Sequence, residues 1–358
     1  MKLKSIPSGL HLLLTMTPRL KRRMLINLFH RFLFTLDPER AHYLALKSMQ
    51  WAYRLGLHHF YRNIPEEPFQ LMNLTFPNRI GLAAGFDKNA DYVDALAALG
   101  FGFIEVGTIT PKPQAGNPQP RLFRLTDEEA IINRMGFNNK GIEHVVRQLE
   151  KTKFRGILGI NIGKNRDTAM DHAIDDYVTG FKSLWPFASY ITINISSPNT
   201  ANLRDLQQAD LLQSLLKTLK SEQQNILQQH KKYVPLVVKI SPDLSETEVH
   251  AIAEILMQQK IDGVIATNTT ITRIGVEQSI FAKEAGGLSG RPLTKRSTEI
   301  VAQLHSILQQ NIPIIAAGGV MDQATAQEKL NAGASLLQIY TGFIYSGPTL
   351  IKKLRGLK

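Results

Sequence analysis

The stretch Leu236-Val-Val-Lys-Ile-Ser241 is apolar except for one lysine, and it ends on a serine. An apolar run without alternation is typical of a parallel strand that is covered on both faces. Seven further runs of this kind are separated by stretches with helical spacing. In chain order, the eight runs are Arg79–Gly85, Phe103–Thr110, Ile157–Gly163, Tyr190–Ser197, Leu236–Ser241, Gly263–Thr269, Ile312–Gly319 and Leu336–Gly342. Eight βα units predict an α/β chain with a (β/α)8 TIM barrel over residues 79–358, and a doubly wound open sheet is the weaker alternative.

The residues before the barrel divide into two parts. Residues 1–57 are predicted to form a small helical extension, because Asp37 and Pro38 make a helix start and Gly56 is a natural stop. Residues 58–78 contain three prolines and are predicted to be an irregular linker.

Positive charge is concentrated in the extension. The formal net charge is +12, and residues 1–36 hold seven Lys or Arg and no Asp or Glu. Between these charges, Leu25, Leu28, Phe29, Phe32 and Leu36 fall roughly on one helix face. No run approaches the ~18–20 apolar residues that span a bilayer, and the order of apolar and basic segments argues against a signal peptide. We therefore expect these residues to lie on an anionic membrane surface, with packing on the body of the protein as the alternative.

The sequence contains no cysteine. This removes disulfides, thiolate metal sites, iron–sulfur ligation and a cysteine nucleophile together, and it indicates a reducing cytoplasm. The histidines are scattered, so we predict no metal site. Acyl-transfer chemistry has weak support, because no Ser-His-Asp arrangement is visible near Ser197.

Polar residues follow nearly every predicted strand, where the site of a TIM barrel is built. They are Asp87 and Lys88, Thr108, Asn161, Asn194 with Ser196 and Ser197, Lys239, Thr267 with Asn268 and Thr269, Gly318 and Gly319, and Tyr340 with Thr341. Loops are polar in any case, so this density is an indication and not a proof.

The last two strands indicate a phosphate site. Ala316-Ala317-Gly318-Gly319 and Tyr340-Thr341-Gly342 offer side-chain-free backbone where such barrels often hold phosphate. The alternative is that these glycines only make tight turns. Ala83-Ala84-Gly85 would let a flat ring lie against the backbone. Lys88 and Lys239 would add two positive charges, which suit a reduced flavin and an acidic substrate.

Four asparagines lie in or beside the predicted strand ends, namely Asn133, Asn194, Asn199 and Asn268. Each side chain can donate and accept hydrogen bonds at once, which matches the alternating N–H and C=O edge of a pyrimidine ring. Asparagine is also common in turns, so spacing alone leaves both readings open.

With these residues in place, the chain resembles the class 2, quinone-linked dihydroorotate dehydrogenases from about Asp37 to the C-terminus. The segments that carry the resemblance are Gly81–Lys88, Asn133–Asn139, Asn161–Lys164, Asn194–Thr200, Ala266–Thr270 and Gly286–Pro292. The resemblance implies oxidation of dihydroorotate to orotate in de novo pyrimidine (UMP) biosynthesis. It also implies one FMN per chain as hydride acceptor and a membrane quinone as final electron acceptor.

The resemblance also implies roles for individual residues. FMN would be held by Ala84, Gly85, Phe86, Asp87, Lys88, Thr108, Asn161, Asn194, Lys239, Thr267, Gly290, Gly319, Tyr340 and Thr341. Dihydroorotate would contact Lys88, Asn133, Arg134, Met135, Gly136, Phe137, Asn194, Asn199, Asn268 and Thr269. Ser197 matches the catalytic base, where class 1 enzymes use cysteine. His42, Arg124 and Tyr340 match residues near the quinone head group.

In that family the helical extension forms a membrane hood that admits quinone. This places the protein at the cytoplasmic face of the inner membrane as a peripheral protein, without nucleic acid and without an iron–sulfur partner subunit. Two alternative functions compete with this interpretation. A flavin barrel that reduces uridine in transfer RNA would use a cysteine acid, which is missing here. A non-catalytic barrel that binds a phosphorylated ligand would not need Ser197, Lys88 and the four asparagines.

Overall fold

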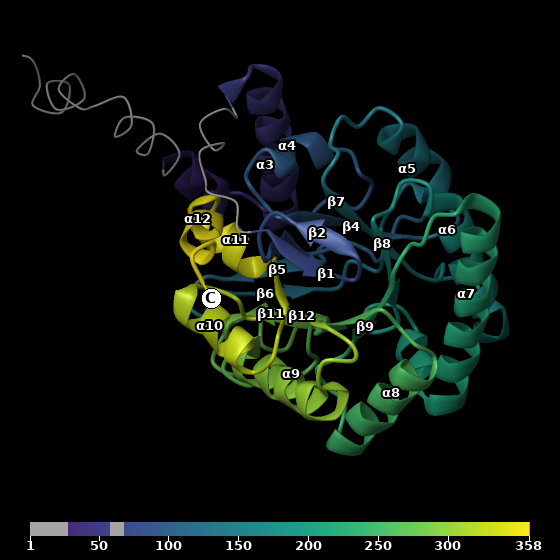
Figure 1. The fold of residues 1–358 in the computed structure, drawn as a ribbon. Helices are drawn as coiled ribbons and strands as arrows, with labels where there is room; N and C mark the ends of the chain where they lie inside the picture. Colours follow the sequence, from purple (N-terminus) through teal and green to yellow (C-terminus); the bar gives the residue numbers. More distant parts are fainter. Residues whose placement is uncertain (1–27, 58–67, 358) are drawn as a thin grey trace, which may run out of the picture. The chain divides into compact units, whose positions relative to one another are not determined.

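Eight parallel strands close into a barrel at the centre of the protein (Figure 1). The strands are β3 (Ile80–Leu82), β4 (Phe103–Ile109), β7 (Ile157–Ile162), β8 (Tyr190–Asn194), β9 (Leu236–Ile240), β10 (Gly263–Ala266), β12 (Ile314–Ala317) and β13 (Leu336–Ile339). Each lies within one of the eight predicted runs. The barrel prediction is therefore confirmed, and the open-sheet alternative is wrong because β9 pairs with β10 and closes the ring. Every residue of these strands except Ile157 is buried, which explains why the runs do not alternate.

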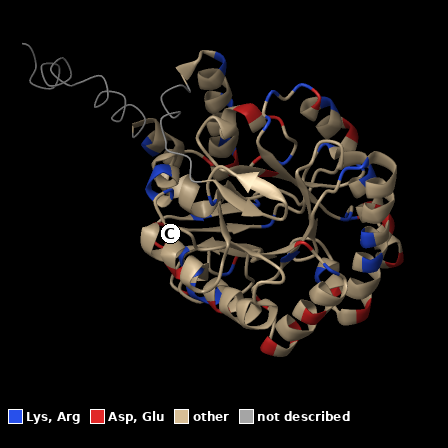
Figure 2. Ribbon diagram, in the orientation of Figure 1, with Lys and Arg blue, Asp and Glu red and all other residues tan. Residues whose placement is uncertain are grey.

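Helices surround the strands in a ring (Figure 1). They are α4 (Val93–Ala97), α5 (Gly141–Leu149), α6 (Ala173–Leu184), α7 (Ala209–His230), α8 (Glu246–Gln258), α9 (Thr294–Leu308), α10 (Gln323–Asn331), α11 (Thr341–Ser346) and α12 (Thr349–Leu354). In α7, Leu212, Leu215, Leu216 and Leu219 follow helical spacing and are all buried. Charged side chains lie mostly on these outer helices and their loops (Figure 2).

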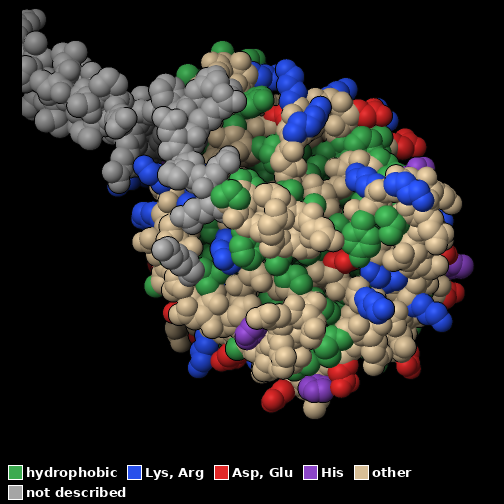
Figure 3. All heavy atoms as spheres, in the orientation of Figure 1, with side chains coloured by type: hydrophobic (Ala, Val, Ile, Leu, Met, Phe, Trp, Pro, Cys, Tyr) green, Lys and Arg blue, Asp and Glu red, His purple; other side chains and the backbone are tan. Residues whose placement is uncertain are grey.

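A two-stranded hairpin covers the N-terminal end of the barrel. It consists of β1 (Phe69–Leu71) and β2 (Leu74–Phe76), inside the segment that the sequence assigns to an irregular linker. Phe76 packs in one cluster with Phe103 and Tyr190, which begin β4 and β8. Figure 3 shows this face, on which charged side chains lie both at the edge and nearer the centre. The two-residue turn is made by Met72 and Asn73 at positive φ, and Met-Asn is not a recognised hairpin signature.

A three-stranded antiparallel sheet, which the sequence did not predict, lies outside the barrel. Its strands are β5 (Leu122–Leu125), β6 (Ala130–Asn133) and β11 (Gly287–Gly290), in the order β11-β6-β5. Phe123, Ile132 and Leu288 belong to a separate apolar cluster that holds it together. The sheet matters for function because Asn133 ends β6 and Gly290 ends β11.

The structure, a computed structural model, describes residues 28–57 and 68–357. The chain separates into two units, Met1–Met49 and Gln50–Lys358. Residues 28–35 are helical, and α3 (Pro38–Arg54) follows. Oδ1 of Asp37 accepts hydrogen bonds from the N–H groups of Glu39 and Arg40 at 3.1 and 3.0 Å, which confirms the predicted helix start. Leu25 and the basic residues before it lie outside the described residues. None of the described helices has the length and hydropathy needed to cross a bilayer.

Candidate active site

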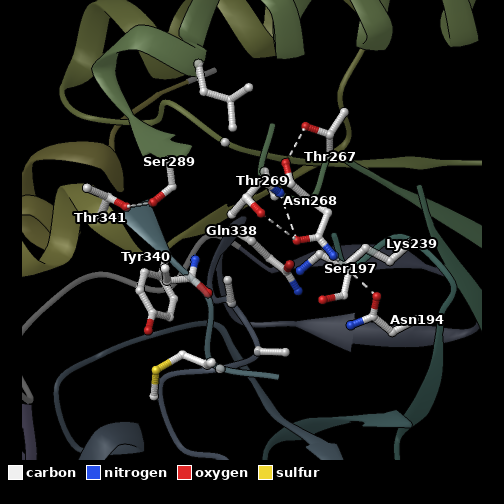
Figure 4. A pocket seen from close by; sticks show the side chains of 18 of the residues that line it. Asn194, Ser197, Lys239, Thr267, Asn268, Thr269, Ser289, Gln338, Tyr340 and Thr341 are labelled. Atoms are coloured by element: carbon white, nitrogen blue, oxygen red, sulfur yellow. Dashed lines mark hydrogen bonds between the residues drawn. The ribbon is translucent and has the colours of Figure 1, made fainter. Parts of the chain in front are cut away.

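A cavity opens at the C-terminal ends of the barrel strands (Figure 4). The space within the cavity and its open mouth together is about 1020 Å³. The lining residues are Ala83, Ala84, Gly85, Lys88, Thr108, Asn133, Met135, Gly136, Phe137, Asn194, Ser197, Asn199, Lys239, Thr267, Asn268, Thr269, Ser289, Gly290, Leu293, Ala317, Gly318, Gly319, Val320, Gln338, Tyr340, Thr341 and Gly342. Most residues predicted for FMN, for substrate and for catalysis are therefore brought together in one place.

A buried hydrogen-bond network supports the base of the cavity. Nδ2 of Asn194 donates to Oγ1 of Thr108 at 2.9 Å and to Oδ1 of Asn161 at 3.1 Å. Thr108 Oγ1 itself donates to Oδ1 of Asn161 at 2.6 Å, and Asn161 Nδ2 donates to Oε1 of Glu105 at 2.9 Å. Each amide orientation is thus determined by its neighbour, which holds the polar groups of β4, β7 and β8 in fixed positions.

Glu105 was not singled out from the sequence, although it is the one charged residue in the apolar run of β4. Its Oε2 accepts hydrogen bonds from Tyr190, Thr192 and Gln338 at 2.9, 3.1 and 2.8 Å. The carboxylate is fully buried in the barrel interior. It also interacts electrostatically with Lys239: burial lowers the pKa of this lysine, and the charge of Glu105 opposes that shift. The buried cation at the cavity therefore has a buried counter-charge.

Ser197 lies on the loop that follows β8 and faces the cavity (Figure 4). Its Oγ accepts a hydrogen bond from the N–H of Asn199 at 3.3 Å. Ser196, the residue before it, makes more hydrogen bonds than Ser197. Asn268 Nδ2 donates to Ser196 Oγ at 3.0 Å, and Arg204 Nε donates to the Ser196 carbonyl at 3.2 Å. The loop is thus held by Asn268, which follows β10, and by Arg204 in the short helix over Leu203–Gln207.

The four predicted asparagines converge at the same mouth. Asn199 Nδ2 donates to Oδ1 of Asn133 at 3.2 Å, and Asn268 Nδ2 donates to Oδ1 of Asn194 at 3.3 Å. The four asparagines come from three chain segments, because Asn194 and Asn199 both belong to the end of β8 and its loop, so a turn preference alone does not explain their meeting. Lys88 joins them from the loop after β3, where its Nζ donates to the Gly85 carbonyl at 2.8 Å.

The opposite end of the cavity is built from backbone and hydroxyl groups. Thr341 Oγ1 donates to Ser289 Oγ at 2.9 Å, and Figure 4 shows this pair apart from Asn194, Ser197 and Lys239. Gly319 has a φ of +74°, and a Cβ there would lie 2.4 Å from Cα of Thr294. This position therefore excludes side chains for steric as well as conformational reasons.

Four of the residues predicted for FMN or substrate lie outside the lining of the cavity: Phe86, Asp87, Arg134 and Asn161. Phe86 packs edge-on against Tyr340, and Asn161 lies behind Thr108 in the network described above. The Asp87 carboxylate accepts hydrogen bonds from three backbone N–H groups of the following turn, while burial raises its pKa to about 6. Arg134 turns to Glu284, with 2.6 Å between Nη1 and Oε2.

The lining also contains residues that the sequence did not single out. They are Ser289, Leu293, Val320 and Gln338. Ser289 lies on β11 within Gly286–Pro292, one of the segments that carry the resemblance, but no role was predicted for its side chain. Gln338 is the one polar residue within the apolar run of β13, and that exception was a usable signal.

The three residues matched to a quinone site lie on separate elements. Tyr340 directly follows β13 at the cavity, and burial raises its pKa to about 12. Arg124 lies on β5 of the outer sheet, and His42 lies on α3 in the N-terminal unit. Their joint role stays a prediction. In the part of the chain that the structure describes, no group of three His, Cys, Asp or Glu side chains could hold a metal ion.

Comparison with known proteins assigns the family. Residues 68–357 match the family described as Dihydroorotate dehydrogenase. The chain is 56% identical over 331 residues to a Nitrosospira multiformis protein named Dihydroorotate dehydrogenase (quinone), covering 92% of this chain and 95% of that one. It is 53% identical over 330 residues to the protein of that name from Acinetobacter baylyi, covering 92% and 98%.

A solved structure gives the same answer for the fold. The crystal structure of DHODH in complex with ferulenol from Eimeria tenella superposes with a TM-score of 0.82 at 41% identity, covering 89% of this chain and 90% of the other. Sequence and structure therefore agree that this chain belongs to the dihydroorotate dehydrogenase family, in its quinone-dependent class 2 branch.

Proposed function

We propose that the protein oxidises dihydroorotate to orotate in pyrimidine biosynthesis, with FMN as hydride acceptor and a membrane quinone as the final electron acceptor. One observation carries the proposal: Ser197, two lysines and four asparagines line one cavity, and its other end offers glycine backbone and hydroxyl groups. A pyrimidine ring that carries a carboxylate needs cations and paired donors and acceptors on one side. A phosphorylated flavin needs open backbone N–H groups on the other.

The residues present fit FMN. Gly319 and Gly290 both have positive φ, and a Cβ at Gly290 would lie 2.3 Å from the Glu129 carbonyl oxygen, so the phosphate end is kept free of side chains. At the floor of the cavity, Gln338 Oε1 is buried and has no hydrogen-bond partner among the described residues. A buried acceptor of this kind is costly unless a bound group donates to it. The N–H of a flavin ring would supply that donor.

The substrate side follows from the same contacts. When bound, FMN supplies the acceptor for the hydride that leaves the ring carbon of dihydroorotate. Ser197 Oγ removes the proton from the neighbouring carbon, next to the carbonyl, and releases it to solvent. Lys88 and the asparagine pairs orient the ring, while Lys239, balanced by Glu105, keeps a positive charge beside the flavin site. These contributions are positional and electrostatic.

We further propose that the N-terminal unit attaches the protein to the cytoplasmic face of the inner membrane. Leu28, Phe29 and Phe32 have exposed side chains in the helix over residues 28–35. Apolar side chains among basic residues favour an interfacial position on anionic lipid. His42, Arg124 and Tyr340 are proposed to contact the quinone head group.

The proposal is tested by an anaerobic visible spectrum of the purified protein. Dihydroorotate should bleach a bound-flavin band, and a soluble quinone should restore it. A flavin band that dihydroorotate leaves unchanged would contradict the substrate and favour another flavin reaction, such as reduction of uridine in transfer RNA. Well-folded protein that binds no added FMN would contradict the cofactor and favour a non-catalytic barrel.

A further inference from the structure

Lys329 is a buried cation outside the cavity. It lies on α10, it is fully buried, and its Nζ donates three hydrogen bonds. The acceptors are the Thr294 carbonyl at 2.8 Å, Ser297 Oγ at 2.5 Å and Thr298 Oγ1 at 2.6 Å. All three are neutral oxygens in the first turns of α9. Burial lowers the pKa of Lys329 to about 7, and the charge of the adjacent Glu328 opposes this shift. Burying a charged group that no anion pairs is energetically unfavourable, which indicates that Lys329 serves a specific role in the folded protein.

The same turns of α9 hold the glycine turn at the phosphate end of the cavity. Thr294 Oγ1 donates to the Gly319 carbonyl at 2.9 Å, and Ser297 Oγ contacts the Gly318 carbonyl at 2.8 Å. Ser297 therefore lies between the ammonium group of Lys329 and the glycine turn. Because Ser297 accepts a hydrogen bond from Lys329, its one hydrogen is directed to a carbonyl oxygen, and the carbonyls of Gly318 and Leu293 both lie at 2.8 Å.

These contacts determine where the neighbouring N–H groups point. In a trans peptide the C=O and the next N–H point in opposite directions. The Gly318 and Gly319 carbonyls face α9, so the N–H groups of Gly319 and Val320 face away from it, and both residues line the cavity. An anion in the cavity would thus meet N–H donors in front and a positive charge behind them.

We propose that Lys329 is a positioning residue for the phosphate group of the cofactor: through Ser297 it fixes the Gly318–Gly319 turn, and it supplies the cation that complements phosphate from behind that turn. This inference rests on the proposed use of FMN. Lys329 is proposed to affect only the phosphate, whereas FMN as a whole also binds through its ring system. Riboflavin has the same ring system without the phosphate, so it separates the two contributions.

The test compares the affinities of flavin-free protein for FMN and riboflavin. Lys329→Met removes the charge and keeps the chain length. We expect its FMN dissociation constant to rise roughly tenfold to hundredfold, the scale on which outer partners of bound ions act, while riboflavin binding stays within about threefold. Ser297→Ala should change the ratio in the same direction, and it remains available if Lys329→Met does not fold.

Lys220→Met is the matched control. Lys220 is also a largely buried lysine, paired with Asp262 at 3.6 Å, and it lies at the opposite end of the barrel beside the β1–β2 hairpin. Its loss should lower stability and leave the ratio of FMN to riboflavin affinity unchanged. A wild-type ratio in Lys329→Met and Ser297→Ala would overturn the role of Lys329 while the FMN proposal stands. Wild-type protein that does not prefer FMN to riboflavin would overturn both.

Discussion

Asn199 and Asn133 lie 66 residues apart, and Nδ2 of Asn199 donates a 3.2 Å hydrogen bond to Oδ1 of Asn133. Asn133 in turn directs its Nδ2 to the Gly287 carbonyl at 3.4 Å. The amide of Asn133 is thus oriented from both sides, by the loop after β8 and by the outer sheet. Because both asparagines line the cavity, their orientation decides which edge of a bound ring they can recognise.

Asn199→Ala should therefore weaken substrate binding more than it affects the flavin. Loss of one oriented hydrogen bond and of a direct contact is expected to raise the KM for dihydroorotate by about tenfold or more. The flavin content should not change. Steady-state kinetics with the visible spectrum of the same samples measure both quantities. Asn311→Ala, an exposed asparagine near the opposite end of the barrel, is the control. An unchanged KM in Asn199→Ala would remove Asn199 from the substrate site.

Ser197→Ala should separate cofactor binding from turnover. The Ser197 side chain accepts a hydrogen bond only from the nearby backbone among the described residues, so its loss should leave the loop in place. Removing a general base is expected to lower kcat by roughly 10²–10⁴-fold. Flavin content and melting temperature should stay near wild type. Wild-type turnover in this variant would show that another group accepts the proton.

The barrel could be predicted because each strand is one continuous apolar run, and the cavity because parallel strands end on one side. The outer sheet could not be predicted from the sequence. Its strands have four residues each, and β6 pairs with β11, which places Asn133 beside a carbonyl 154 residues further along the chain. Such pairing leaves no local signal. Glu105 is the one charged residue in the apolar run of β4, so it offered the same usable signal as Gln338 and was overlooked. Lys329 could not be found in this way, because it lies beside another charge on a helix, where the sequence does not reveal that a charged residue is buried.

Deletion of residues 1–36 should affect quinone use more than flavin binding. This segment holds seven basic residues and no acidic ones, and each Lys or Arg near an anionic surface contributes about 1 kcal/mol. We expect weaker partitioning onto anionic vesicles and slower turnover with a long-chain quinone. Flavin content and reduction by dihydroorotate should persist. Unchanged partitioning and quinone kinetics would contradict the membrane role and favour packing of this segment on the body of the protein.

The stability of flavin-free protein should depend on pH through Lys329. Its pKa is about 7 in the folded protein, below the ordinary value of 10.5. Between these values the unfolded chain binds more protons than the folded one, so the free energy of unfolding should rise as pH increases from about 7 to 10. Chemical denaturation of wild type and Lys329→Met across this range isolates the contribution. Equal slopes in both proteins would show that Lys329 does not titrate in this window.

Gly319→Ala tests the phosphate end of the cavity by sterics alone. A Cβ at this position would lie 2.4 Å from Cα of Thr294, a backbone atom that cannot rotate away. The Gly318–Gly319 turn must therefore shift, and FMN affinity should fall by at least tenfold. Gly347→Ala is the matched control, because Gly347 also has positive φ, +62°, but a Cβ there meets nothing within 4 Å. It should cost only about 1 kcal/mol of stability from backbone strain and keep FMN affinity. If both variants bind FMN like wild type, the glycines after β12 serve the turn and not the cofactor, and the phosphate would have to be held elsewhere in the cavity.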